Sequence, residues 1–433
     1  MAFIPEIEQQ SAIEQAVFQL QKLKETLHYI KRNAPFYAAK LNGYENIIAN
    51  LSSLEDLQHL PTTSKEDLQE YNWDFLCVPK KDIAEYMSTS GTLGKPVVIA
   101  LTANDLERLA YNEYLSFHLM DVNDADVFQL MLTLDRQFMA GIAYYNGLRK
   151  IGASVIRSGP GLPALQWETM EQFDVTALVA VPSFLSKMMD VADETMFKSL
   201  KVKKVLAIGE SLKDEYLQPN VLAQKIKNKW DIELYSTYAS TEMQTAFTEC
   251  QAGQGGHLHP ELIIVEILDE EGRQLPEGEA GEVTITTLGI EGMPLLRYRT
   301  GDICKAYYQP CSCGRNTMRL GPVLGRKKQM IKFKGTSVYP PQLFDTLHEL
   351  EAVTDYVLEV ISDDDCQDVL NIYIHTKMNE ADCSNILKPV FQHKWRVTPN
   401  IIYKTLAELQ QMQFPNNSRK PIRFIDRRAA SKY

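Results

Sequence analysis

The residues Tyr86–Pro96 read Tyr-Met-Ser-Thr-Ser-Gly-Thr-Leu-Gly-Lys-Pro, and this stretch predicts a loop that holds an anion. Glycines let the backbone turn so that several N–H groups converge on one anion, while hydroxyls add donors and lysine adds charge. It is not a Walker A loop, because Gly91 and Gly94 are too close together and proline follows Lys95. The aliphatic run 96–101 is typical of a strand. We therefore expect a loop between two strands that folds over a nucleotide triphosphate, with a plain polar hairpin turn as the alternative.

The composition indicates a globular protein of more than one domain. The chain has 433 residues, a net charge of −11 and no long basic run, so nucleic acid is not an expected partner. No stretch has the length and apolarity of a membrane span, and the start, Met-Ala-Phe-Ile-Pro-Glu, lacks the pattern of a signal peptide. The 7 cysteines are too few for a disulfide scaffold and odd in number, which predicts a reducing cytoplasm. The composition leaves a homodimer open.

Residues 126–219 alternate between predicted strands and helices. We predict strands at Val127–Thr133, Ser154–Arg157, Ala177–Val181 and Lys204–Ile208, and helices at Gly141–Ile151, Ala164–Phe173 and Ser183–Ala192. This alternation favours a largely parallel sheet that helices cover on both faces. Ligands of such sheets bind at the carboxyl ends of the strands. The tripeptide Gly209-Glu210-Ser211, which directly follows a strand, should therefore line the site.

The later part of the chain changes pattern twice. Residues 261–287 hold short β runs separated by turn-rich segments, which predicts an antiparallel subdomain. Beyond Gly325 a small α+β pattern begins, with strands at Tyr356–Ile361 and Val369–His375 and a helix at Glu380–Gln392. The predicted fold class is α/β: a large N-terminal domain, residues 1–325, with mainly parallel sheets and the antiparallel subdomain, and a small mobile α+β domain, residues 326–433.

Two helical signals lie near the beginning of the N-terminal domain. Residues 8–33 carry apolar side chains three and four positions apart, which predicts an amphipathic helix. Those side chains are Ile13, Val17, Leu20, Leu23, Leu27 and Ile30. Farther on, Pro61-Thr-Thr-Ser-Lys-Glu66 resembles a helix cap.

Three cysteines and a histidine form a possible metal set. Cys311 and Cys313 flank one residue in a Pro-Cys-Ser-Cys-Gly turn, and Cys250 and His257 border a glycine-rich segment. Three sulfur ligands and one nitrogen make a closed structural zinc set with no open position for catalysis. The spacings differ from those of zinc fingers. Reduced thiols at a domain edge are the alternative, and His259 and Cys304 are the fallback ligands.

Several downstream motifs follow in a fixed order. They are Tyr238-Ala-Ser-Thr-Glu242, Tyr298-Arg-Thr-Gly-Asp302, Gly325-Arg326 with Ile331-Lys-Phe-Lys-Gly335, and Ser418-Arg-Lys-Pro-Ile-Arg423. With the Tyr86–Pro96 stretch, their order and separations resemble the adenylate-forming superfamily, the acyl-CoA synthetases and their relatives. Within it the chain looks most like the phenylacetate-CoA ligase family, and the resemblance runs from Ala34 to Arg428. Part of that family also carries the Cys/His pattern.

The resemblance implies a nucleotide site and its metal. Glu242 is the expected Mg²⁺ ligand and Thr241 an α-phosphate contact, with a surface carboxylate as the alternative role for Glu242. Asp302 should accept the ribose hydroxyls, and Arg326 should reach the ribose or phosphate. The β- and γ-phosphates of ATP would lie against Ser88, Thr89, Ser90, Gly91, Thr92 and Lys95. The adenine slot and its strand would use Gly209, Glu210, Ser211, Ser236, Tyr238, Ala239 and Ser240. Ala239 stands where the family usually has glycine.

The resemblance also implies two half-reactions with different catalytic groups. Lys420 matches the family's catalytic lysine, preferred over Lys404, although Arg419 replaces the usual glycine before it. Lys328 occupies the hinge position. A rotation there would remove Lys420 and bring Lys334 and Gly335 to coenzyme A.

The acyl pocket is the least specific part of the sequence. Asp135-Arg-Gln-Phe-Met-Ala-Gly141 occupies the family's aryl-binding region, so Phe138, Ala140 and Gly141 are the candidates, with ordinary core packing as the alternative for Phe138. We expect an AMP-forming ligase that joins phenylacetate or a related aryl acid to coenzyme A, using ATP and Mg²⁺. The rival predictions are an adenylate-forming ligase for another acceptor, similar to the coenzyme F390 synthetases, and a catalytically silent nucleotide-binding module.

Overall fold

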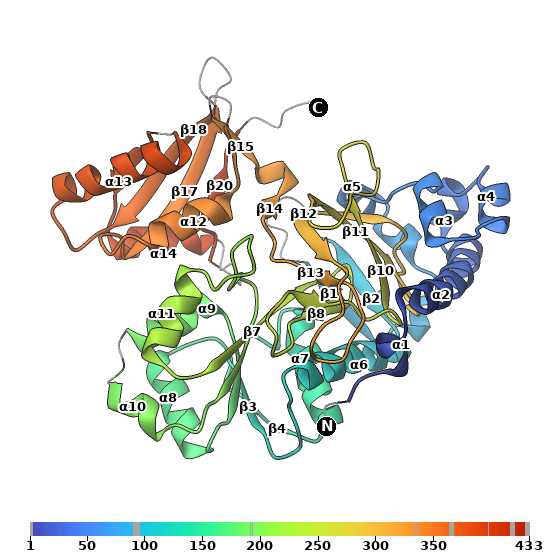
Figure 1. Ribbon diagram of the computed structural model, residues 1–433, viewed down its shortest axis with the longest axis horizontal. Coiled ribbons are helices and arrows are strands. Elements are labelled where there is room, and N and C mark those ends of the chain that lie inside the picture. Colours follow the sequence, from blue (N-terminus) through green and yellow to red (C-terminus); the bar gives the residue numbers. More distant parts are fainter. Residues whose placement is uncertain are drawn as a thin grey trace. The chain divides into compact units, whose positions relative to one another are not determined.

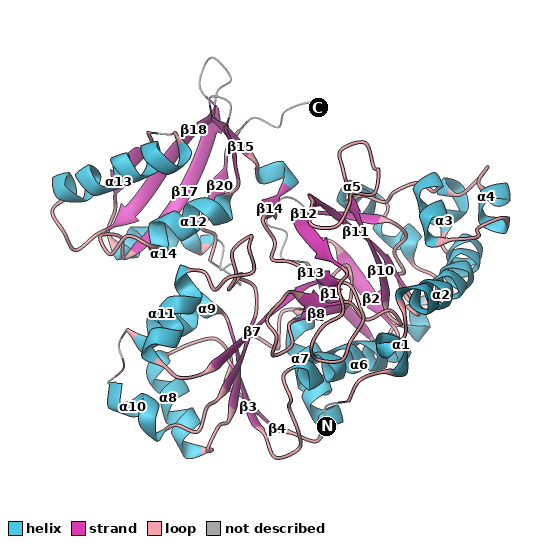
Figure 2. Ribbon diagram, viewed as in Figure 1, coloured by secondary structure: helices cyan, strands magenta, loops and turns pink. Residues whose placement is uncertain are grey.

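The computed structural model describes residues 3–89, 96–190, 192, 194–333, 336–362, 368–396, 398–415 and 421–428. The chain divides into two compact units, Met1–Val323 and Leu324–Tyr433, which we call the N-terminal and C-terminal units. Figure 1 traces the chain through both, and Figure 2 shows that each contains helices and strands. Over the described ranges, no helix combines the length and the apolarity needed to cross a membrane.

The first sheet of the N-terminal unit has the strand order β4-β3-β5-β6-β7-β8. Its strands are β3 (Val127–Leu130), β4 (Ser154–Arg157), β5 (Ala177–Ala180), β6 (Lys204–Ala207), β7 (Glu233–Ser240) and β8 (Thr245–Thr248). All neighbours pair in parallel except β7 and β8, which form an antiparallel hairpin. The predicted parallel sheet is therefore confirmed, although β3 ends at Leu130, short of the predicted Thr133.

Helices cover both faces of this sheet, and the strand residues explain why. Leu178 and Val205 pack into one hydrophobic cluster with side chains of α8 (Pro163–Gln172), α9 (Pro182–Met189) and α11 (Val221–Lys229). Their chain neighbours Val179 and Leu206 pack into another, with α6 (Ala103–Leu119) and α7 (Met139–Ile151). Successive strand residues point to opposite faces, so continuous apolar strands need a helical layer on each side.

The second sheet of the N-terminal unit is antiparallel, as predicted for residues 261–287. Its path is β10-β11-β12-β13-β9, made of β9 (Gly256–His257), β10 (Ile263–Leu268), β11 (Ala280–Thr287), β12 (Tyr298–Tyr307) and β13 (Arg319–Leu320). A separate hairpin pairs β1 (Glu85–Ser88) with β2 (Val98–Leu101). The remaining helices are α1 (Glu6–Gln9), α2 (Ala12–Asn33), α3 (Pro35–Lys40), α4 (Glu45–Ala49), α5 (Lys65–Glu70) and α10 (Glu194–Ser199).

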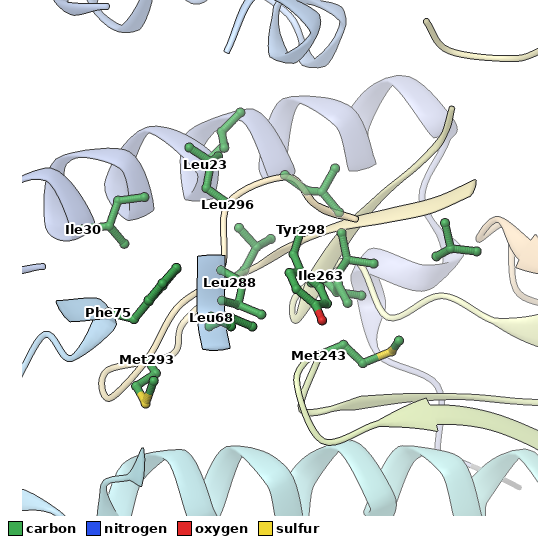
Figure 3. Packing of buried hydrophobic residues seen from close by; sticks show 14 of the residues in the cluster. Leu23, Ile30, Leu68, Phe75, Met243, Ile263, Leu288, Met293, Leu296 and Tyr298 are labelled. Carbon is green, nitrogen blue, oxygen red and sulfur yellow. The ribbon is translucent and has the colours of Figure 1, made fainter. Parts of the chain in front are cut away.

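The largest hydrophobic cluster joins α2, the hairpin and the antiparallel sheet. Leu23 and Ile30 of α2 belong to it together with Ile263 of β10 and Tyr298 of β12 (Figure 3). Met243, from the connection between β7 and β8, is fully buried in the same cluster. This core therefore extends to the connection between β7 and β8, which also contains the predicted ligand Glu242.

The amphipathic helix predicted over residues 8–33 is wrong at its beginning. Ser11 and Glu14 form a capping box, so a new helix starts at Ala12. Ile13 and Val17 are 78% and 63% exposed, although their spacing predicted a buried face. Gln19 takes the buried place, because its amide donates to the Ile263 carbonyl at 2.9 Å and thereby satisfies a backbone group.

The C-terminal unit is a four-stranded sheet with helices, the predicted α+β pattern. The order is β19-β18-β17-β20, from β17 (Asp355–Ser362), β18 (Asp368–His375), β19 (Asn400–Tyr403) and β20 (Phe424–Asp426). The helices are α12 (Pro340–His348), α13 (Glu380–Trp395) and α14 (Leu406–Gln413), and the smaller strands are β14 (Gly325–Arg326), β15 (Ile331–Phe333) and β16 (Thr336–Val338). The fold class predicted from the sequence, with an α/β unit followed by a small α+β unit, is confirmed.

Candidate active site and metal centre

The predicted phosphate loop connects β1 to β2, and the structure describes only its base. Thr89 N donates to the Val97 carbonyl at 3.0 Å, and Val97 N donates to Thr89 Oγ1 at 3.0 Å. The Thr89 hydroxyl therefore links the two ends of the loop. Ser88 N donates to the Gln137 carbonyl at 3.0 Å, which ties the base to the predicted acyl region. The predicted ligands Ser90, Gly91, Thr92 and Lys95 lie outside the described residues.

Glu242 lies in the turn between β7 and β8, residues 241–244, which we call the Glu242 turn. The residue is 7% exposed, so the alternative role of Glu242 as a surface carboxylate is wrong. The hairpin register pairs Ser240 with Thr245 across the turn. Met243 N donates to Ser240 Oγ at 3.3 Å, and the Met243 side chain is buried in the core. The turn thus presents a carboxylate at the end of β7, the strand next to the edge strand β8.

Two side chains that the sequence did not single out face Glu242. Lys65 Nζ, in the first turn of α5, lies 3.6 Å from Glu242 Oε1. The Tyr298 hydroxyl lies 3.5 Å from the same oxygen, and burial and then the Glu242 charge raise the pKa of Tyr298 well above its usual value. Tyr298 therefore stays a neutral donor. The Thr-Thr-Ser-Lys-Glu segment had predicted only a helix cap, although its lone lysine was a usable signal.

Tyr238 and Asp302 come together from different sheets. The Tyr238 hydroxyl donates to Asp302 Oδ2 at 2.8 Å, and Asp302 is 7% exposed. Burial and then the Asp302 charge raise the Tyr238 pKa well above its ordinary value. Asp302 N donates to Thr300 Oγ1 at 3.1 Å, and Gly301 has φ 78° inside β12, where the register with β11 shifts, a conformation that glycine adopts readily. The result is a fixed, buried carboxylate with one oxygen oriented by a phenol.

The predicted adenine residues have different local tasks. Glu210 accepts from Ser183 N at 2.9 Å and from Ser183 Oγ at 2.8 Å, so its carboxylate caps the start of α9. Ser211 Oγ donates to the Lys213 carbonyl at 2.8 Å. Gly209 has φ 77°, which turns the chain after β6. Of this tripeptide, the backbone at Gly209 remains the better candidate for lining a ligand than the Glu210 and Ser211 side chains.

The predicted acyl region begins with two residues in the left-handed conformation. Arg136 and Gln137 have φ 56° and 57°, and Phe138 occupies the N-cap position of α7, with its side chain partly buried against a core cluster. A Cβ on Gly141 would lie 2.4 Å from the Thr133 carbonyl oxygen, so packing of α7 requires this glycine. The strained entry to α7 is shaped by tertiary contacts, not by local preference.

The remaining catalytic candidates belong to the C-terminal unit. Lys334, Gly335 and Lys420 lie outside the described residues. Arg326 is exposed, and the backbone carbonyl of the hinge candidate Lys328 accepts from Arg428 Nη2 at 3.3 Å. Lys404, the alternative to Lys420, pairs with Glu408 at 3.0 Å at the start of α14.

The structure brings Cys250, His257, Cys311 and Cys313 together, a group that we call the Cys/His cluster. All ligand atoms lie within 4.8 Å of one another. Cys250 Sγ and Cys311 Sγ are 3.6 Å apart, and Cys313 Sγ and His257 Nε2 are 3.5 Å apart. Tetrahedral zinc with its usual bond lengths would place two sulfurs about 3.8 Å apart and a sulfur and a nitrogen about 3.6 Å apart. The observed donor set fits zinc in both chemistry and spacing.

Surrounding groups orient the cluster. His257 Nδ1 lies 3.0 Å from Thr317 Oγ1, which leaves Nε2 directed at the thiols. The hydrogen bond with His257 is the largest contribution that lowers the pKa of the Cys311 thiol, which favours the thiolate that binds metals. The fallback His259 instead lies 2.6 Å from Glu8 Oε1, and Cys304 is buried in the β12 core outside the cluster.

Comparison with known proteins gives consistent likenesses. The family model for AMP-binding enzymes matches residues 20–291. The phenylacetate-coenzyme A ligase of Thermus thermophilus is 28% identical over 378 residues, which cover 83% of this chain and 81% of that protein. The phenylacetate-coenzyme A ligase of Escherichia coli strain K12 is 26% identical over 364 residues, or 82% of this chain and 81% of that protein.

Solved structures extend the likeness to the whole chain. A 2-hydroxyisobutyryl-CoA ligase, in the postadenylation state with 2-HIB-AMP, has a TM-score of 0.83 at 21% identity, covering 98% of this chain and 91% of that one. The anthranilate CoA ligase AuaEII with anthranoyl-AMP has a TM-score of 0.58 at 17% identity, covering 80% of this chain and 68% of that one. At these identities the likeness shows the fold.

Proposed function

The chain belongs to the family of AMP-binding enzymes, and from this premise we propose that it ligates an aryl carboxylic acid, phenylacetate or a close relative, to coenzyme A through an acyl-adenylate. The observation that carries the proposal is that the N-terminal unit holds two buried carboxylates with defined neighbours. Glu242 faces Lys65, and Asp302 accepts a hydrogen bond from Tyr238. The relatives named phenylacetate-coenzyme A ligase support the choice of acid.

The first half-reaction joins two anions. A carboxylate oxygen attacks the α-phosphorus of ATP, the bond to the β-phosphate oxygen breaks, and pyrophosphate leaves. The charge that builds up around the phosphorus must be neutralised by fixed cations and N–H donors. The loop between β1 and β2, the Lys65 ammonium and Lys420 are the groups of this chain that would supply them.

Glu242 is the residue that would hold Mg²⁺. Its carboxylate is a hard oxygen ligand in a buried place, and Mg²⁺ takes only one or two protein carboxylates while keeping waters and phosphate oxygens. When bound, the ion neutralises phosphate charge. The Lys65 ammonium and the Tyr298 hydroxyl both face the same carboxylate oxygen, Oε1, at 3.6 Å and 3.5 Å.

The second half-reaction replaces AMP with a thioester. The coenzyme A thiol releases its proton to water, its sulfur attacks the acyl carbonyl, and the bond between the acyl carbon and the adenylate oxygen breaks, so AMP leaves. The Lys334-Gly335 segment is the candidate for this step after a rotation at Lys328. The Cys/His cluster takes no part in either step. We assign it structural zinc, since all of its ligand positions come from protein side chains.

A panel of carboxylic acids, assayed with ATP for pyrophosphate with and without coenzyme A, tests the proposal. Phenylacetate or a close aryl relative should give pyrophosphate, AMP and an acyl-CoA in equal amounts. Pyrophosphate without a thioester for every acid would favour ligation to another acceptor, as in the coenzyme F390 synthetases. Binding of ATP with no pyrophosphate from any acid would favour a silent nucleotide-binding module.

The Asp302→Ala variant should raise the KM for ATP. We place the ribose hydroxyls on this carboxylate, and a hydrogen bond to a charged group contributes roughly 1.5–3 kcal/mol, so the KM should rise about tenfold to a hundredfold. Tyr238→Phe is the matched control. It keeps the Asp302 carboxylate and removes only the Tyr238 hydroxyl that orients it, so the KM for ATP should rise less than in Asp302→Ala. Steady-state kinetics at saturating acid measure both. Unchanged ATP kinetics in Asp302→Ala would put this residue outside the site.

A further inference from the structure

Arg108, in α6, donates to backbone carbonyls of several other elements. Nε donates to the Leu288 carbonyl at 2.8 Å, and Nη1 donates to the Gln244 carbonyl at 2.9 Å. Nη2 donates to the Leu262 carbonyl at 2.5 Å and lies 3.3 Å from Thr245 Oγ1. These acceptors are neutral oxygens, and burial lowers the Arg108 pKa to about 10, so the guanidinium stays charged at neutral pH. A planar guanidinium fork suits several fixed acceptors better than an ammonium does.

The Gln244 carbonyl belongs to the last residue of the Glu242 turn. Gln244 has φ 49°, a left-handed conformation that residues other than glycine, asparagine and aspartate seldom adopt. Such a residue persists only where its surroundings determine its conformation. Its own side chain does not supply the restraint, because Nε2 of Gln244 is buried without a hydrogen-bond partner among the described atoms. The bond from Arg108 to the carbonyl supplies it from outside.

α6 is itself fixed, so it can act as a support. Asp105, at the start of the helix, accepts from Gly292 N at 2.8 Å and from Glu291 N at 2.8 Å. Asn112 lies one turn beyond Arg108 on the same face, and its Oδ1 accepts from Ala246 N at 3.1 Å. The helix therefore holds both the end of the Glu242 turn and the start of β8.

The side-chain contacts of Glu242 do not fix it closely. Its neighbours Lys65 and Tyr298 lie 3.6 Å and 3.5 Å away, at or beyond the usual limit of a hydrogen bond. The position of the carboxylate therefore depends on the backbone of its turn, which Met243 anchors on the core side and Gln244 closes on the α6 side.

We propose that Arg108 is a positioning residue for the nucleotide-bound divalent cation: by fixing the strained end of the Glu242 turn, it sets where the Glu242 carboxylate stands. The inference rests on the proposed function, because it takes Glu242 as the cation's ligand. Arg108 itself touches no reacting group.

Binding of Mn²⁺ together with α,β-methylene ATP, followed by electron paramagnetic resonance, tests this without turnover. Arg108→Lys keeps a charge but loses the fork, so the Mn²⁺ affinity of the enzyme–nucleotide complex should fall about tenfold or more, the usual effect of losing a group that orients a metal ligand. Amide hydrogen exchange in the Glu242 turn should also become faster.

Arg319→Lys is the matched control. Arg319 is another buried arginine of the N-terminal unit that donates to backbone carbonyls, those of Gln254 at 2.9 Å and Gln309 at 3.0 Å, away from the turn. Arg319→Lys should lower the melting temperature to about the same extent as Arg108→Lys while leaving the Mn²⁺ affinity unchanged. Equal weakening in both variants would overturn the inference, because the effect would then be general loss of stability. Unchanged affinity in a folded Arg108→Lys would overturn it as well.

Thr245→Val covers the case in which Arg108→Lys does not fold. It is nearly isosteric and removes only the most distant acceptor of Arg108, so Mn²⁺ affinity should fall, but by less than the about tenfold loss expected for Arg108→Lys; unchanged affinity overturns the inference. Mn²⁺ binding by the wild type distinguishes a failure of the Glu242 assignment from a failure of the Arg108 role. If wild type and nucleotide together bind no more Mn²⁺ than nucleotide alone, the assignment of Glu242 fails and the inference falls with it. If the wild type binds Mn²⁺ and no variant differs, only the role of Arg108 fails.

Discussion

Replacing Lys420 with alanine should slow formation of the acyl-adenylate by about 10²-fold or more, the usual loss when one electrostatic group leaves a transition state. We expect this lysine, from the resemblance, to neutralise charge only while the carboxylate and the α-phosphate join. Thioester formation begins from attack on a neutral carbonyl, and the proposed rotation at Lys328 would leave Lys420 without a part in that step. Conversion of supplied phenylacetyl-AMP to phenylacetyl-CoA should therefore stay nearly intact. Single-turnover kinetics of each half-reaction measure the two effects separately.

Lys404→Ala is the control for this experiment. Lys404 pairs with Glu408 at 3.0 Å beside the capping box of α14, so its loss should leave adenylation close to wild type. If Lys420→Ala slows both half-reactions equally, the lysine supports general structure, and the proposed rotation at Lys328 between the two half-reactions is contradicted. If Lys420→Ala slows neither and Lys404→Ala slows adenylation, the catalytic lysine is Lys404.

Removing the Cys311 thiol should deprive the protein of its metal and of much of its stability. The wild type should carry about one equivalent of zinc. The binding energy of a structural metal is also folding energy. Cys311→Ser should therefore lower the free energy of unfolding by several kcal/mol and the Tm by on the order of 10 °C. Elemental analysis and calorimetry on the same sample measure both quantities.

Cys304→Ser provides the comparison for the zinc experiment. Cys304 is fully buried in the core of the same unit but lies outside the cluster, so this variant should keep its zinc. Wild-type protein that is free of metal and fully stable would contradict the zinc assignment. Zinc loss in Cys304→Ser equal to that in Cys311→Ser would contradict the ligand set.

Much of the fold was predictable because its signals are local. Continuous apolar strands such as Ala177–Ala180 can only be satisfied between two helical layers, and the alternation over residues 126–219 follows from that. The predicted resemblance to adenylate-forming ligases is likewise confirmed by the family match. The buried face of α2 was not predictable in the same way. Gln19 is buried because it meets a backbone carbonyl of β10, a partner that helical spacing cannot reveal.

The candidate site was predictable motif by motif, but its contacts were not. The motifs containing Glu242 and Asp302 named a turn after β7 and a position inside β12, yet the links from Glu242 to Lys65 and from Asp302 to Tyr238 join segments far apart in the chain. Glu210 shows the opposite limit. It follows its strand as a site residue should, and its carboxylate caps α9. The roles of Arg326 and Lys420 stay predictions.

Transfer of oxygen-18 from the acid to AMP tests the central claim most directly. Phenylacetate labelled with oxygen-18 at both carboxylate oxygens is incubated with the enzyme, ATP, Mg²⁺ and coenzyme A, and the nucleotide product is analysed by mass spectrometry. Because a carboxylate oxygen attacks the α-phosphorus and the adenylate later leaves with that oxygen, the AMP should carry a single labelled oxygen. Unlabelled AMP, or ADP with label in the released phosphate, would contradict an acyl-adenylate and with it the proposed function.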